Sequence, residues 1–171
     1  MMKRTLLKIH HSLTMLTLKK LLLTISMGCL MTAVNAAPMD DARTAYNKGD
    51  YKEALGIWRP LADQGDVDAQ YNIGLMYEVT QNYKEAVKWY RLAAVQEDAV
   101  AQYSIGVMYH NGQGVTKDYI RAHMWYNLSS LSSYANGTKD RDLLAKEMTP
   151  QQIEKAQNMA RECEAKDFKE C

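Results

Sequence analysis

Apolar residues recur at helical spacing in the first half of the 171-residue chain. Four of them fall at i, i+4, i+7 and i+8 and form one stripe: Ala54, Trp58, Leu61 and Ala62. A second stripe, over residues 69–77, follows a turn that contains Gly65. Because stripes of this kind bury one face of a helix, the pattern predicts a helical hairpin.

The same pattern returns 32 residues further along the chain. Eight residues of the first copy have counterparts in the second: Tyr51, Ala54, Trp58, Ala62, Ala69, Gln70, Gly74 and Tyr77 match Tyr83, Ala86, Tyr90, Ala94, Ala101, Gln102, Gly106 and Tyr109. A third half-copy begins at Tyr119, and the four extra residues before it fall in a loop over residues 110–118. One hairpin cannot bury its apolar face alone, so the copies are expected to stack into a solenoid.

We expect one domain over residues 37–171. Its repeats lie at about residues 50–81 and 82–117, with a partial repeat at 118–134 and a C-terminal cap at 139–171. Thr149, Pro150 and Gln152 predict the start of the last helix, because Thr caps, Pro suits the first turn and Gln completes a capping box.

The first 36 residues have the composition of a secretory signal peptide. They contain five basic residues and no acidic one, and the apolar run from Leu21 to Val34 precedes a small residue at Ala36, after which we expect cleavage. Translation from Met15 instead of Met1 would leave a leader of ordinary length. Two alternatives stay open: a membrane anchor, for which the run is short, and lipidation at Cys29, where Ser26 replaces the usual Leu.

Removal of this leader leaves 16 basic and 20 acidic residues, a net charge of −4. A mildly acidic domain lacks the basic stripe that neutralises phosphates, so nucleic acid is not an expected partner. We expect a periplasmic or secreted protein with no membrane span after cleavage; the oligomeric state stays open.

Three segments, over residues 82–94, 101–109 and 112–115, resemble the Sel-1-like repeat, a relative of the tetratricopeptide repeat. The resemblance covers about residues 40–170. It implies an all-α, right-handed α-solenoid of helix-turn-helix repeats with a C-terminal capping helix, and a protein-protein interaction scaffold that binds a protein or peptide. The sequence departs from the family at Glu97, where Gly is common, and in the short 78–82 connection.

The mature chain keeps two cysteines, Cys163 and Cys171, and an oxidising compartment favours a disulfide. On one continuous helix their Cα atoms would lie about 12 Å apart, beyond disulfide reach, so a bridge requires the helix to turn. The spacing of eight equals that from Ala62 to Gln70, and the resemblance supports a disulfide at this spacing. A redox-active pair is the alternative, although such motifs usually place the cysteines two residues apart.

No residue pattern in the mature chain indicates catalysis, a metal or a cofactor. Its two histidines are His110, expected at a helix end, and His123, expected on an exposed or half-buried face. Motifs for zinc, phosphate loops and nucleophilic serine are missing. We therefore expect no enzyme; the alternative is a cell-wall-linked or β-lactam-hydrolysing activity, which has been associated with cysteine-rich relatives.

The predicted binding surface is the concave face, where related tetratricopeptide domains hold extended peptides. Residues that point away from the packing stripe form two sets, one in each repeat: Tyr71, Asn72, Leu75 and Glu78, then Tyr103, Ser104, Val107 and His110. Each set combines an aromatic ring with apolar and polar groups, which is the mixture that peptide capture requires.

Overall fold

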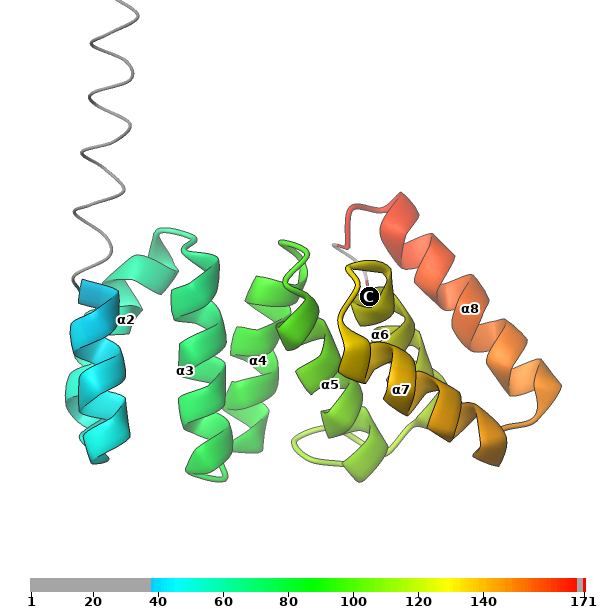
Figure 1. Cartoon of the computed structure of the whole chain (residues 1–171), viewed down its shortest axis with the longest axis horizontal. Coiled ribbons are helices and arrows are strands. Elements are labelled where there is room, and N and C mark those ends of the chain that lie inside the picture. The colour runs from blue at the N-terminus through cyan, green and yellow to red at the C-terminus, as the bar shows by residue number, and fades with distance from the viewer. Residues whose placement is uncertain (1–37, 169–170) are drawn as a thin grey trace, which may run out of the picture.

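The computed structural model describes residues 38–168 and 171, and these residues form helices and turns with no strand (Figure 1). The helix bounds are residues 38–48, α2 (Tyr51–Asp63), α3 (Val67–Val79), α4 (Tyr83–Ala94), α5 (Ala99–Asn111), α6 (Tyr119–Leu131), α7 (Ala135–Leu144), the 3-10 turn η1 (Ala145–Glu147) and α8 (Pro150–Ala165). Successive helices from α2 to α7 pack side by side in a row, which confirms the predicted all-α solenoid. The leader predicted over residues 1–36 lies outside the described residues.

Large rings on alternate helices form the centre of the packing. Trp58 on α2, Tyr90 on α4 and Tyr126 on α6 are each at most 2% exposed. A Cβ added at Gly74 would lie 2.5 Å from the Tyr90 ring, and one added at Gly106 would lie 2.5 Å from the Tyr126 ring. Small residues therefore let α3 and α5 approach the rings of α4 and α6, as the repeat of large and small residues predicts.

The hairpin turns repeat their hydrogen bonds as well as their sequence. Gln70 donates from its buried amide to the Ala62 carbonyl oxygen, and Gln102 donates to that of Ala94. In the turns themselves, Gly65 and Glu97 both have a positive φ, +94° and +67°. Glu97 thus occupies the left-handed conformation that the glycine at the same place in the first turn adopts without strain.

The last helix begins as predicted. Thr149 accepts a hydrogen bond from the Gln152 amide, while the Gln152 side chain accepts one from the Thr149 amide, and Pro150 takes the first helical position. This reciprocal pair satisfies amide groups that a helix start would otherwise leave free. From there α8 packs back against α6 and covers that end of the row (Figure 1).

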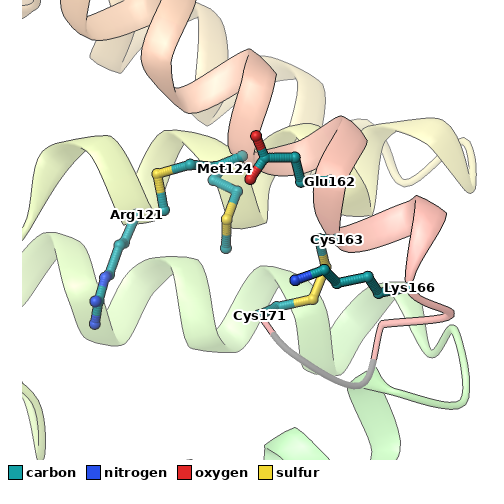
Figure 2. A pocket seen from close by; sticks show the side chains of 7 residues that line it. Arg121, Met124, Glu162, Cys163, Lys166 and Cys171 are labelled. Carbon is teal, nitrogen blue, oxygen red and sulfur yellow. A yellow bond between two sulfur atoms is a disulfide. The ribbon is translucent and has the colours of Figure 1, made fainter.

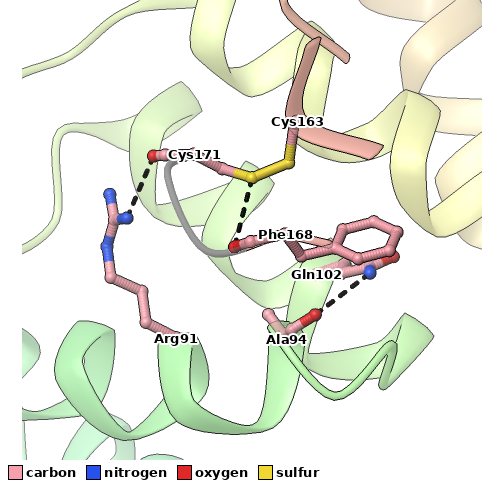
Figure 3. The surroundings of a disulfide bond; sticks show 6 residues. All are labelled: Arg91, Ala94, Gln102, Cys163, Phe168 and Cys171. Carbon is pink, nitrogen blue, oxygen red and sulfur yellow. Dashed lines mark hydrogen bonds between the residues drawn. A yellow bond between two sulfur atoms is a disulfide. The ribbon is translucent and has the colours of Figure 1, made fainter. Parts of the chain in front are cut away.

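The chain turns after α8 and returns to it. Cys163 and Cys171 form a disulfide with their Cα atoms 5.3 Å apart (Figure 3). The Phe168 amide donates to the Cys163 carbonyl oxygen, the bond that Asp98 makes to Ala93 in the second hairpin turn. This hydrogen bond aligns Cys163 with Ala93. The spacing of eight from Ala62 to Gln70 would instead align Cys163 with Ala94, the counterpart of Ala62, one residue later.

Candidate functional site

The predicted binding residues lie on two neighbouring helices of the row. α3 carries the first set and α5 carries the second, and all eight side chains are half-buried. The sets are 32 residues apart, so equivalent residues occupy equivalent places on the two helices.

Tyr71 and Tyr103 contribute to packing as well as to the surface. The Tyr71 ring lies 5.6 Å from that of Tyr90, and the Tyr103 ring lies 5.5 Å from that of Tyr126 and 5.3 Å from that of Tyr134. Burial raises the pKa of both hydroxyls, and Tyr134 and Asp140 respectively make the next largest contributions. Both phenols therefore stay neutral at physiological pH and can donate hydrogen bonds.

A hydrogen bond joins α3 to α4 at the first ring. The Tyr90 hydroxyl donates to the Glu78 carboxylate over 2.6 Å, and burial followed by this bond raises the Tyr90 pKa far above its ordinary value. Ser104 donates to the Val100 carbonyl oxygen of its own helix. Three of the eight predicted residues are thus already engaged within the protein: Glu78, Ser104 and Tyr103, whose hydroxyl bonds to Asp140.

The second set borders a pocket between α5, α6 and α7. The pocket has a volume of about 280 Å³ and is lined by Tyr103, Val107, His110, Asn111, Tyr126, Asp140 and Leu143. Tyr103 donates to one oxygen of Asp140 over 2.7 Å. The structure therefore brings three of the predicted residues, Tyr103, Val107 and His110, into one concave site.

Sequence reasoning missed the contribution of α7. Asp140 and Leu143 lie 36 residues after Ser104 and Val107, the offset that separates Tyr119 from Tyr83. The repeat signal was therefore present in the sequence. Because α7 lacks the aromatic residues of the earlier copies, its residues resemble a C-terminal cap more than a further repeat.

A smaller pocket of about 160 Å³ lies beside the disulfide (Figure 2). Its lining includes both cysteines together with Arg121, Met124, Met159, Glu162 and Lys166. Arg91 donates to the main-chain oxygen of Cys171 over 3.1 Å (Figure 3). It also donates to the Tyr109 hydroxyl over 2.8 Å. The first bond attaches the C-terminal turn to α4, and the second joins α4 to α5.

His123 lies elsewhere than expected. It is 2% exposed on α6, not on an exposed or half-buried face, because the surrounding helices cover it. Its Nδ1 atom has no hydrogen-bond partner, and burial, followed by the charge of Arg141, lowers its pKa. Within the described part of the chain no three His, Cys, Asp or Glu side chains are grouped to hold a metal.

No helix in the described ranges has the length and apolar character needed to cross a membrane. No curated protein matches the chain in sequence. The Sel1 repeat family matches residues 67–98 and 99–134. These units have the predicted period but begin half a repeat after the predicted repeats. The first unit therefore contains α3 and α4, and the second contains α5 and α6.

Two solved structures are similar to this chain. One is a protective antigen of uropathogenic Escherichia coli strains that displays an SLR fold, with a TM-score of 0.70 and 25% identity over 78% of this chain. The other is a Sel1 repeat protein from Oxalobacter formigenes, with a TM-score of 0.59 and 26% identity over 64% of this chain. The match spans 31% and 46% of their respective lengths.

Three observations indicate the same helical repeat: the period in the sequence, the packing of glycines on rings, and the family match. Such repeats commonly serve as protein-interaction scaffolds. The chain therefore contains two Sel1 repeats, at residues 67–98 and 99–134, within an α-solenoid.

Proposed function

We propose that this protein is an exported scaffold that binds a protein or peptide along the face formed by α3, α5 and α7, without catalysing a reaction. The carrying observation is that equivalent apolar residues of alternate helices continue one another: Leu75 and Val107, which are half-buried, and Leu143, which is exposed, occupy the same place on α3, α5 and α7. An extended partner could contact one apolar side chain per repeat, with tyrosines beside it that add area at low entropic cost.

Export is supported by two independent features. The first 36 residues are basic and apolar with a small-residue cleavage site, as a secretory leader requires. The Cys163–Cys171 geometry suits a disulfide, which persists in the periplasm or outside the cell.

The test is capture of a partner from a cell-envelope extract by the oxidised mature protein. Tyr71 and Tyr103 are poor positions to substitute in this test, because their rings pack on the buried rings of Tyr90 and Tyr126. Leu75→Lys with Val107→Lys places two charges in the proposed face, and desolvation of these charges should weaken capture at least about tenfold. The matched control, Leu92→Lys with Leu131→Lys, makes the same change at residues 45% and 57% exposed on α4 and α6.

A partner retained by the control variant and lost by the face variant would support the proposal. Thermal unfolding of both variants must first show that they are folded. Capture that is unchanged by Leu75→Lys with Val107→Lys would place the binding surface elsewhere, and capture of nothing by the unsubstituted protein would remove the scaffold proposal.

A further inference from the structure

Two equivalent junctions of the repeat are built differently. At the first junction, between α3 and α4, the Glu78 carboxylate accepts a hydrogen bond from the Tyr90 hydroxyl. At the second, His110 stands where Glu78 would be, and its ring centroid lies 6.4 Å from that of Tyr126. The 280 Å³ pocket lies at this second junction.

The pocket combines aromatic walls with a carboxylate. Tyr103, His110 and Tyr126 supply rings, and Asp140 stands at the position that Ser104 occupies one repeat earlier. Asp140 Oδ2 accepts a hydrogen bond from Tyr103, and the carboxylate lines the pocket. The carboxylate shares this pocket with both phenols, Tyr103 and Tyr126. Burial, then Tyr103, then the charge of Asp140 raise the pKa of Tyr126.

Arg141, the residue that follows Asp140, makes its hydrogen bonds to other partners. The guanidinium of Arg141 donates to Asn127, Ser130 and Asp142. The pocket thus keeps a negative charge beside ring faces, and two aliphatic side chains, Val107 and Leu143, complete its lining.

We propose that this pocket receives the guanidinium of an arginine side chain carried by the bound peptide. A carboxylate next to aromatic rings attracts a cation, and the aliphatic residues suit the methylene stem of arginine. The volume lies just below the usual range of small-molecule sites, roughly 300–1,000 Å³, and suits a single side chain. A guanidinium fits better than an ammonium because it is planar, stacks on rings and is more weakly hydrated.

This inference rests on the proposed function and names the partner's chemistry. The mature chain is acidic, with a net charge of −4, which also favours a basic partner. The predicted ligand is an extended segment with an arginine placed to reach α7 while its neighbours contact Val107 and Leu75.

A small probe tests the pocket without an identified partner. N-acetyl-arginine N-methylamide is titrated into methyl-labelled protein, and the methyl NMR signals of Val107 and Leu143 are followed. We expect saturable shifts for this probe and none for the neutral citrulline analogue, which has nearly the same shape. The lysine analogue should bind more weakly than the arginine probe.

Asp140→Asn removes the charge but keeps an acceptor for Tyr103, and it should weaken arginine binding by about tenfold or more. Glu154→Gln, an equal charge change on an exposed residue of α8, should leave binding unchanged. Equal binding of citrulline or lysine, or full binding by Asp140→Asn, would overturn the inference. A partner lost by the Leu75 and Val107 variant but captured fully by Asp140→Asn would overturn the arginine assignment while the scaffold proposal stands.

Discussion

At the scale of single residues, two glycines set how closely the helices approach. Gly74 faces the ring of Tyr90 and Gly106 faces that of Tyr126, each too close for a Cβ. Both rings are fully buried, so they have little room to withdraw. The 32-residue recurrence of glycine in a helix, where it is a poor helix former, is explained by this contact.

Gly106→Ala should therefore lower the free energy of unfolding by about 1–3 kcal/mol, the usual cost of overpacking. Gly56→Ala is the matched control, because a Cβ at this α2 position meets nothing within 4 Å. There the better helix propensity of alanine should raise stability by about 0.5–1 kcal/mol. Urea unfolding of the two variants measures both effects, and a change of the same sign in each would contradict the packing explanation.

The buried His123 makes stability depend on pH. Its pKa is lowered in the fold, so the unfolded chain binds a proton first as the pH falls below about 6.5. The histidine therefore favours the folded state above that pH, and the free energy of unfolding should decrease from pH 7.5 to pH 5.5. His123→Gln should flatten this decrease while His110→Gln retains it; an unchanged profile in His123→Gln would show that another group is responsible.

At the scale of helices, an aspartate precedes the first residue of several helices, but only some of these aspartates cap the helix with a side-chain hydrogen bond. Asp66, Asp98 and Asp118 each accept hydrogen bonds from amides in the first turn of the next helix. Asp50 stands before α2 in the same way, yet its side chain makes no such bond. The sequence shows the same residue in each place, and only the backbone angles distinguish the caps.

Asp98→Ala should cost about 1 kcal/mol, since it leaves the Ala101 amide without its capping partner. Asp50→Ala makes the same substitution without removing a cap bond and should change stability by less than about 0.5 kcal/mol. Thermal unfolding monitored by circular dichroism compares them directly. Equal losses in the two variants would mean that helix-dipole charge, not the hydrogen bond, is what these aspartates contribute.

At the scale of the whole molecule, the disulfide closes the C-terminal end of the solenoid. Mass spectrometry of the non-reduced protein should detect the Cys163–Cys171 bridge, and two free thiols would refute it. Reduction should lower stability by about 2–3 kcal/mol, because the unfolded chain regains the freedom of a short loop. Cys163→Ser with Cys171→Ser should unfold like the reduced protein and should not respond to reductant.

Much of this architecture is readable from the order of residues alone. The offset of 32 between Gly74 and Gly106 reflects a recurring contact, because each of these glycines faces a ring on the next helix, so local spacing carries the information. The helix over residues 38–48 was missed as a repeat element, although Ala42 precedes Gly74 by the same 32 residues. Its sequence before Tyr51 matches the later copies too weakly to be recognised without the packing partner.

The sequence by itself determined the helical period, the repeat offset and the start of the last helix, because each depends on residues within a few turns of one another. Only the tertiary structure decided that Glu78 spans its junction whereas His110 borders a pocket, and that His123 is buried. Those outcomes depend on neighbours from other helices, such as Asp140 beside Tyr103, 37 residues apart. Distances between side chains that far apart in sequence are set by helix stacking, which no local pattern encodes.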